Sequence, residues 1–288
     1  MKILSFGEIL WDVYPKTKAI GGAALNFGAH LRRHGAEVYM LSSLGNDALG
    51  REARLWLAEN GMPDTFVEAS KNPTGACLVT LGENKIPSYD LLADVAWDQI
   101  NAPKKLDPDF DVLYFGTLAQ RSAHNKKTLI TLLENYSFRE IFVDMNVRAP
   151  HTTADSIRFA TEHATILKIS DEELPTVKAA LGIPESLDDK EAISALAAEH
   201  KNLKIILLTL GERGACALYD GNFFEVSAEA ATPISTVGAG DSFSAAFIYK
   251  YLLGERIEAA MRYAAKISAF VVSSVDAVPK YSPSDFNG

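Results

Sequence analysis

The fold is decided by the stretch Thr236-Val237-Gly238-Ala239-Gly240-Asp241-Ser242-Phe243, in which two glycines flank an alanine and an aspartate follows at once. Apolar residues then recur at helical spacing as far as Gly254, a residue type that commonly follows the end of a helix. The stretch therefore predicts a glycine loop that enters the N-terminus of a helix.

A helix N-terminus of this kind attracts an anion, because its first N–H groups have no partner inside the helix and the helix dipole adds positive charge. The glycines let the backbone approach that anion closely. Asp241, in the same turn, is favoured in its ionised form and would stand beside a bound phosphate as a proton acceptor. The pairing indicates phosphoryl transfer to a hydroxyl; an aspartate that only caps the helix after an ordinary loop is the alternative.

Other uses of a glycine-rich turn fit less well. The chain has no G-x-x-x-x-G-K-[ST] motif of a P-loop, and Gly238-x-Gly240-x-x-Phe243 lacks the third glycine of a dinucleotide fingerprint. Gly240-Asp241-Ser242-Phe243 resembles a block found in serine esterases. All six histidines precede Ser242, however, and the downstream Asp-x-x-His of such esterases is absent.

Composition limits the class of protein. The chain has 288 residues and a formal net charge of -9, and its 48% hydrophobic and 23% charged residues are typical of a soluble globular protein. A chain of this length can form one large α/β domain or a domain with a smaller appendage. The acidic balance argues against nucleic acid or an anionic membrane as the main partner. No segment reaches the roughly 20 apolar residues of a membrane span. Cys77 and Cys216 have no second ligand at metal-binding spacing, so we expect core thiols in a reducing compartment and a cytoplasmic protein without a signal peptide.

Strand-like and helix-like segments alternate along most of the chain, which favours an α/β fold. The nearly continuous apolar run at 203–210 predicts a central parallel strand that is buried on both faces. Strands are expected at 3–6, 38–41, 112–115, 141–144, 165–169, 203–210, 215–219 and 223–226. One helix is expected to end at His34 and another to follow the glycine loop. The other helices are expected at 48–59, 126–136, 154–163, 172–181, 190–200 and 258–274.

The alternation is interrupted between Thr65 and Leu92, where short β-like runs occur at 65–68, 76–80 and 86–89 without an amphipathic helix. We interpret this region as a small β-sheet attached to a single domain of residues 1–288, with a lid formed from about 13–20 and 64–92. Such a lid could close over a site and exclude water, as a phosphoryl transferase requires. It could also form an oligomer surface, or do both.

Two polar residues near the N-terminus are candidates for binding a polyol. Asp12 lies just past a short buried strand, where ligands bind in open α/β sheets, although a solvated loop acid is an equally simple reading. Asn26 is expected in the first turn after Gly21-Gly22, and its amide can both donate and accept hydrogen bonds. His30 and His34 share a face of the same helix, but without a third ligand they are expected to be packing or surface residues.

Several motifs together resemble one family, the ribokinase-like (PfkB) carbohydrate kinases, over Lys2 to Pro279. The start Gly7-Glu8-x-Leu10-x-Asp12 and the Lys-x-Ser-x-x-Glu form of one motif are most similar to fructokinases. The motifs are Gly21-Gly22-Ala23 with Asn26, Asp144-x-Asn146-x-Arg148, Lys168-x-Ser170-x-x-Glu173, Thr209-Leu210-Gly211-Glu212-Arg213-Gly214 and Gly238-Ala239-Gly240-Asp241.

The resemblance implies a three-layer α/β/α sandwich with a small β lid, ATP as donor and Mg²⁺ as cofactor. It implies that Asp241 is the base and that the N–H groups of Gly238, Ala239, Gly240 and Asp241 form an anion hole. It further implies that Glu173 holds Mg²⁺ through water and that a homodimer forms through the lid. The remaining implied positions are the sugar-binding residues Asp12, Gly22, Asn26, Asn146 and Arg148, with Arg148 near the sugar or the phosphates, and the nucleotide-binding residues Lys168, Ser170, Thr209, Gly211 and Gly214.

The chain departs from the family pattern at three positions. Ser170 stands where most relatives have asparagine, as it often does in fructokinases. Ser235 replaces an aspartate of a monovalent-cation loop, and Asp276 replaces a glycine that faces this loop. We hypothesise that the carboxylate has moved from one wall of the loop to the other and that K⁺ still binds; loss of the K⁺ site is the alternative.

The predicted function is an ATP-dependent sugar kinase, with D-fructose converted to fructose 6-phosphate. The partners are then the small-molecule sugar and ATP. A kinase for 2-keto-3-deoxygluconate or another ketose or pentose is the alternative within the class, because the Arg148 fork could pair with a substrate carboxylate. From a different class, a catalytically silent sugar or nucleotide sensor remains open, although retention of Asp241 with its whole glycine loop argues against it.

Overall fold

The structure, a computed structural model, describes residues 1–81, 87–107 and 109–286. Its main sheet is formed by β1 (Lys2–Phe6), β4 (Glu37–Gly45), β5 (Val67–Ser70), β8 (Val112–Gly116), β9 (Glu140–Asp144), β10 (Ile166–Ser170), β11 (Ile205–Thr209), β12 (Ala215–Tyr219) and β13 (Asn222–Val226). Within the described residues the strand order is β13-β12-β11-β10-β9-β8-β1-β4-β5. The strands from β11 to β5 pair in parallel, whereas β12 and β13 add an antiparallel edge.

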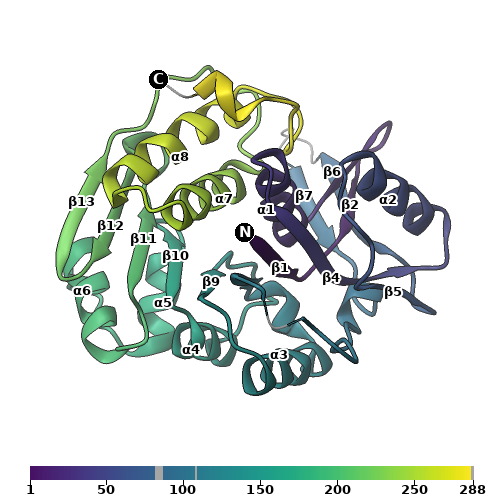
Figure 1. The fold of residues 1–288 in the computed structure, drawn as a ribbon, viewed down its shortest axis with the longest axis horizontal. Helices are drawn as coiled ribbons and strands as arrows, with labels where there is room; N and C mark the ends of the chain where they lie inside the picture. Colours follow the sequence, from purple (N-terminus) through teal and green to yellow (C-terminus); the bar gives the residue numbers. More distant parts are fainter. Residues whose placement is uncertain (82–86, 108, 287–288) are drawn as a thin grey trace.

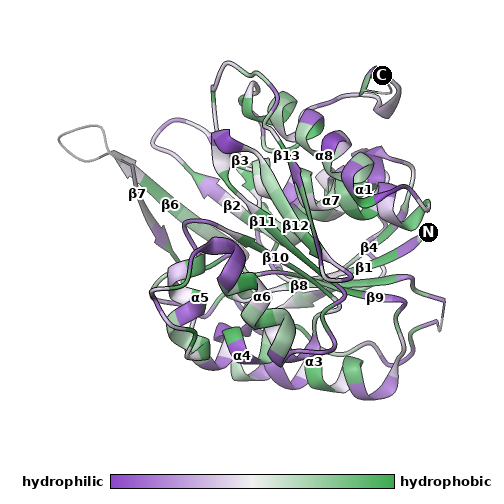
Figure 2. Ribbon diagram, turned by 90° about the vertical axis from the view of Figure 1, so that its left-hand side faces the viewer, coloured by the Kyte–Doolittle hydropathy of each residue, from purple (hydrophilic) through white to green (hydrophobic). Residues whose placement is uncertain are grey.

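Helices cover both faces of this sheet (Figures 1 and 2). One face packs against α1 (Ala23–Arg33), α2 (Ala48–Glu59), α7 (Ala239–Leu252) and α8 (Ile257–Val272), and the other against α3 (Ala123–Asn135), α4 (Ala154–His163), α5 (Leu174–Leu181) and α6 (Asp189–Glu199). Strand β11 contributes Ile205 and Leu207 to one core and Ile206 and Leu208 to the other, which explains its continuous apolar run. The predicted three-layer α/β/α fold is confirmed. The strand predicted to be central and parallel, β11, pairs in parallel with β10 but antiparallel with β12.

Helix boundaries follow local signals in the sequence. Asp47 caps α2 by accepting a hydrogen bond from the Gly50 N–H, and Asp188 with Glu191 forms a capping box at α6. Gly254 follows α7 with φ +86, the left-handed conformation that favours glycine. The prediction that this glycine terminates the helix is confirmed. No helix in the described ranges is both long enough and apolar enough to cross a membrane.

A second, smaller sheet projects from one side of the molecule (Figure 2). It consists of β2 (Leu10–Val13), β3 (Lys18–Gly21), β6 (Gly75–Leu81) and β7 (Pro87–Leu91), in the order β3-β2-β6-β7. The sequence places its segments at about 13–20 and 64–92, and two of these bounds are wrong. The sheet begins earlier, at Leu10, and the strand predicted near residues 65–68 does not belong to it.

That strand is β5, which pairs in parallel with β4 at the edge of the main sheet. Val67 is buried in the core beneath this edge, and the Arg54 guanidinium donates a hydrogen bond to its carbonyl. Burial of Val67 and the unpaired backbone groups of β4 favour this position over the small sheet. The strand predicted at 86–89 starts at a residue outside the described ranges; β7 accounts for its remainder.

Candidate active site

The glycine loop forms the first turn of α7, as the sequence predicts. Gly238 is the residue before the helix and has φ +82, a conformation that glycine adopts without strain. The Ala239 carbonyl accepts hydrogen bonds from the hydroxyls of Ser242 and Ser268, at 2.8 and 3.1 Å. The Ala239 N–H donates to the Thr236 carbonyl at 3.2 Å, whereas the N–H groups of Gly238, Gly240 and Asp241 have no carbonyl partner among the described contacts. This end of α7 therefore leaves three of the four predicted donors available to an anion, and Ala239 is not among them.

Asp241 lies in this turn and is half-buried. Its Oδ2 accepts a hydrogen bond of 2.8 Å from Nδ2 of Asn26, on α1. Burial raises the pKa of Asp241 to about 7, and the negative charge of Asp144 adds to the increase, while the Asn26 hydrogen bond and the charges of Lys168 and Arg148 oppose it. A carboxyl group with this pKa is divided between its acid and base forms near neutral pH and can accept a proton there.

Asn26 occupies a position that the sequence assigns to a bound polyol. Its Nδ2 is bonded to Asp241, whereas its Oδ1 is buried without a hydrogen-bond partner in the described part of the chain. A buried acceptor without a partner is costly, so this oxygen is suited to a hydroxyl of a bound molecule. Asn26 can therefore orient Asp241 and contact a ligand at the same time.

An ion pair lies beneath the glycine loop. Nζ of Lys168, on β10, is 3.1 Å from Oδ1 of Asp144, at the end of β9, and both side chains are buried. Oδ2 of Asp144 also accepts a hydrogen bond from the Ser244 hydroxyl on α7. Burial alone would lower the pKa of Lys168, but the carboxylates of Asp144 and Glu173 raise it above its usual value. Lys168 therefore holds a positive charge inside the site.

The same lysine explains one glycine of the loop. A Cβ atom on Gly240 would stand 3.0 Å from Nζ of Lys168, closer than ordinary van der Waals contact. Gly240 is inside α7 and its φ is not positive, so the requirement is for space and not for an unusual backbone. The loop can lie directly over the buried ammonium group because this position has no side chain.

The Ser170-x-x-Glu173 motif forms a reciprocal pair at the start of α5. Oγ of Ser170 accepts from the Glu173 N–H at 3.3 Å, and Oε2 of Glu173 accepts from the Ser170 N–H at 2.8 Å. This is the geometry of a capping box, so part of the motif serves the fold. Oε1 of Glu173 accepts from the Val147 N–H at 2.8 Å, which ties α5 to the loop after β9.

That loop contains Asn146 and Arg148. Asn146 is buried and has φ +41, and the Thr117 hydroxyl donates a 2.6 Å hydrogen bond to the neighbouring Met145 carbonyl. Arg148 is exposed, yet its charge lowers the pKa of Asp12 and of Asp241. Its Nη1 donates to the Val147 carbonyl at 3.2 Å, and its charge opposes the increase that burial causes in both pKa values.

The N-terminal part of the site lies where β2 and β3 lead into α1. Burial raises the pKa of Asp12, and Arg148 opposes this increase. Gly22 has φ +114, and a Cβ there would stand 2.5 Å from the Glu8 carbonyl oxygen. Oε1 of Glu8, which is itself buried, accepts from the Ala23 N–H at 2.8 Å and so stabilises the start of α1.

The remaining predicted residues lie in two turns. Thr209 ends β11 opposite Ser170, and Gly211 (φ +57) and Gly214 (φ +103) turn the chain into β12. Ser235 is half-buried before the glycine loop and Asp276 is exposed after α8. The N–H groups of Ile234 and Ser235 both donate to the Val272 carbonyl, so the two predicted cation-loop segments are joined.

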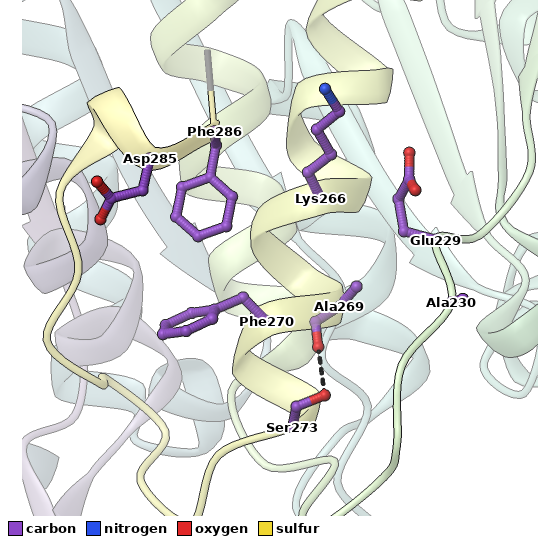
Figure 3. Close-up of a pocket in the computed structure, with 8 residues that line it drawn as sticks. All are labelled: Glu229, Ala230, Lys266, Ala269, Phe270, Ser273, Asp285 and Phe286. Carbon is purple, nitrogen blue, oxygen red and sulfur yellow. Dashed lines mark hydrogen bonds between the residues drawn. The ribbon is translucent and has the colours of Figure 1, made fainter. Parts of the chain in front are cut away.

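A separate pocket of about 410 Å³ lies on the outer side of α8 (Figure 3). The rings of Phe270 and Phe286 and the charged ends of Glu229, Lys266 and Asp285 lie around it, with Ala230, Ala269 and Ser273. None of the residues predicted from the sequence lines this pocket. Its polar groups are not those of the glycine-loop site.

The structure thus joins Asp241, Gly240, Asn26 and Lys168 by direct contacts and connects Arg148 to them by its charge. No described contact joins Asp241 to the other predicted residues Thr209, Gly211, Gly214, Ser235 and Asp276. Sequence reasoning missed Asp144, Tyr114 and Glu8. Asp144 begins one of the motifs, and its place at the end of an apolar run is the available signal. Tyr114 gives no such signal; its hydroxyl is buried and has no hydrogen-bond partner among the residues that the structure describes.

Comparisons with known proteins identify the family and the fold. The model of the pfkB family carbohydrate kinase matches residues 4–283. The probable fructokinase-3 of Arabidopsis thaliana is 27% identical over 312 residues, covering 96% of this chain and 87% of that protein. The 5-dehydro-2-deoxygluconokinase of Geobacillus thermodenitrificans is 26% identical over 283 residues, covering 91% and 82%. The solved fructokinase of Vibrio cholerae O395 in its fructose, ADP and calcium ion bound form shares the fold, with a TM-score of 0.83 at 19% identity, covering 96% and 94%.

Proposed function

Because the chain belongs to the pfkB family of carbohydrate kinases, we propose that it transfers the γ-phosphoryl group of ATP to D-fructose and forms fructose 6-phosphate. The observation that carries the proposal is Asp241 at the N-terminus of α7, held by Asn26 and with its pKa raised to about 7. A base with that pKa next to an anion-binding helix end is suited to deprotonating a hydroxyl that attacks a phosphoryl group.

In this mechanism the sugar hydroxyl approaches Oδ1 of Asp241, because Oδ2 already accepts a hydrogen bond from Asn26. Asp241 takes the hydroxyl proton as the sugar oxygen bonds to the γ-phosphorus of ATP. The bond from that phosphorus to the β,γ-bridging oxygen breaks at the same time, and ADP leaves with its electron pair. The N–H groups of Gly238, Gly240 and Asp241 stabilise the negative charge of the transferring group, and the Lys168 ammonium beneath Gly240 adds to that field. Fixed donors of this kind supply most of the catalysis in phosphoryl transfer.

The donor set fits magnesium held through water. Each Glu173 carboxylate oxygen accepts one backbone N–H and has capacity for another donor, which a metal-bound water supplies. Mg²⁺ neutralises phosphate charge when it is bound. We place the nucleotide along Lys168, Ser170, Thr209, Gly211 and Gly214, at the carboxyl ends of β10 and β11.

The sugar is proposed to lie between the small sheet and α7. Asp12 and Asn26 would accept its hydroxyls, with Gly22, Asn146 and Arg148 around them. The small sheet would act as a lid that excludes water.

Leu78 on β6 is 38% exposed, which supports a homodimer through this sheet. Both cysteines are buried free thiols, consistent with a reducing compartment such as the cytoplasm.

A carboxylated keto sugar such as 2-keto-3-deoxygluconate is the second candidate acceptor. The exposed Arg148, whose charge lowers the pKa of Asp12, favours it because a guanidinium fork pairs with a carboxylate. The similarity to 5-dehydro-2-deoxygluconokinase also supports it.

We also propose that K⁺ binds at Ser235 and Asp276, whose oxygen donors suit a hard cation and whose loops are joined at Val272.

The experiment is an ATP-consumption assay with Mg²⁺ across fructose, ribose, glucose, mannose, tagatose, 2-keto-3-deoxygluconate and nucleosides, with Asp241→Asn beside the parent. We expect fructose turnover that falls about 10²- to 10⁴-fold in the variant with fructose binding retained. Faster turnover of the carboxylated sugar would favour the second candidate. If ATP binds and no sugar is turned over, a sensor is the better explanation.

The same assay, with K⁺ replaced by Na⁺ at constant ionic strength, tests the cation proposal. Parent activity should rise with K⁺, and Asp276→Ala should weaken that response. Identical flat responses would contradict K⁺ binding at this loop.

A further inference from the structure

His30 and His34 lie one turn apart on α1, are both buried, and have no part in the mechanism above. Each ring nitrogen of His30 is bonded: Nε2 is 2.9 Å from the Ala277 carbonyl oxygen and Nδ1 is 2.9 Å from the Tyr281 hydroxyl. A carbonyl can only accept, so Nε2 donates and Nδ1 accepts from Tyr281. Burial lowers the pKa of His30 to about 3, which keeps the ring neutral in this tautomer.

His34, at the end of α1, makes a separate set of contacts. Its Nδ1 donates to the His30 carbonyl at 2.7 Å, and its Nε2 accepts from the Tyr263 hydroxyl, on α8, at 2.9 Å. Both histidine rings also contact the Tyr281 ring, each at a centroid distance of 5.8 Å. Of the two histidines, His30 is the one that bonds to the Ala277 carbonyl beside the site.

The carbonyl that His30 holds lies against the glycine loop. A Cβ atom on Gly238 would stand 2.6 Å from the Ala277 oxygen and 2.9 Å from the Ala277 Cβ. The residue that begins the α7 turn therefore rests on the peptide of Ala277. A shift of that peptide would displace Gly238 and the N–H groups that follow it.

One face of α1 supports both parts of the α7 turn. Asn26 bonds to the Asp241 carboxylate, and His30, four residues later, holds the Ala277 carbonyl under Gly238. Residues four apart lie on the same side of a helix. Helix α1 thus holds both the proposed base, Asp241, and the Ala277 peptide against which Gly238 packs.

We propose that His30 is a positioning residue for the phosphoryl transfer proposed above: its Nε2–H fixes the Ala277 carbonyl against Gly238 and thereby fixes the direction of the N–H groups in the α7 turn. The inference rests on the proposed function for its catalytic consequence. The structural part, that His30 orders this turn, can be measured without turnover.

The test compares His30→Leu with His30→Gln, whose amide N–H keeps a donor toward Ala277, and with His34→Leu as the matched loss of a buried histidine. We expect His30→Leu to lower kcat about 10- to 100-fold with the fructose KM nearly unchanged, because misplaced anion-hole donors act in the transition state. His30→Gln should recover most of kcat. His34→Leu should lower the melting temperature similarly and leave kcat near the parent value.

Hydrogen–deuterium exchange of residues 236–242 gives the readout that is independent of activity, and it should accelerate in His30→Leu but not in His34→Leu. If His30→Leu does not fold, Tyr281→Phe tests the same tautomer and should accelerate exchange in the same segment. Equal losses of kcat in both leucine variants, or unchanged exchange at 236–242, would overturn the proposal. A parent that phosphorylates none of the sugars would instead refute the proposed function, and the exchange comparison would still decide the role of His30.

Discussion

In the part of the site formed by α7, β9 and β10, Lys168 and Asp144 are buried and bonded to each other. In the small sheet, Asp12 is half-buried and Leu78 is partly exposed. The first region fixes charges in a low-dielectric interior, where each electrostatic interaction is strong and each unpaired group is costly. The second region, where we propose that the acceptor binds, has side chains that are partly exposed to solvent. With the acceptor bound there, its identity could change with few substitutions while the buried charges stay in place.

The largest effect should follow from Lys168→Met, which leaves the buried Asp144 carboxylate without its cation. We expect the free energy of unfolding, measured with urea, to fall by about 3–5 kcal/mol. Turnover should fall by about 100-fold, because the anion-binding turn loses the charge beneath it. Lys190→Met removes an exposed ion pair with Glu225 and should leave the free energy of unfolding nearly unchanged.

A double variant separates the two roles of this lysine. Lys168→Met with Asp144→Leu removes both buried charges and should recover much of the stability but little of the turnover. If Lys168→Met were no less stable than Lys190→Met, the buried pair would not be the strong interaction that the comparison of the two regions assumes.

A smaller effect concerns pH. The base must be deprotonated, and the raised pKa of Asp241 means that it keeps its proton until about pH 7. We therefore expect kcat/KM for the free enzyme to be constant above about pH 7 and to decrease about tenfold per pH unit below it. Arg148 lowers the pKa of Asp241, so Arg148→Leu should move this midpoint upward, whereas Arg148→Lys, which keeps the charge, should not. A profile that stays flat down to pH 5.5 would contradict the assignment of Asp241.

The smallest effect on turnover is expected from the outer surface of the small sheet. Leu78→Glu should shift the protein from dimer to monomer in sedimentation equilibrium, because it places a charge in the proposed contact. Ile130→Glu, at a position on α3 with 37% exposure against 38% for Leu78, is the matched control and should leave the oligomeric state unchanged. A parent protein that is monomeric at all concentrations would refute this contact.

The parts of the fold that the sequence predicts depend on local patterns. The glycine loop before α7, the glycine that ends this helix and the buried strand near Ile205 each follow from neighbouring residues. The joint order of the motifs predicts the layers of the fold. The strand at Val67–Ser70 was assigned to the wrong sheet because its partner, β4, is chosen by burial of Val67 in the tertiary structure.

The contacts that define the site depend on residues far apart in the chain. Asn26 was predicted to bind the sugar, and its bond to Asp241 spans 215 positions. The sequence places Asp144 in a motif but does not predict its ion pair with Lys168, because that pair depends on the register of β9 and β10. The His30 tautomer depends on Ala277 and Tyr281, which no local pattern connects to α1.

During synthesis, His30 can support the α7 turn only after a distant segment of the chain has been made. His30 and Tyr281 are 251 positions apart, so α1 leaves the ribosome long before the segment that must bond to it. The cores of the early strands and helices can pack while the anion-binding turn is still absent. We therefore expect the α7 turn to reach its final geometry only after residues 277–281 have left the ribosome and packed against α1. A nascent chain can thus be largely folded without being able to transfer a phosphoryl group.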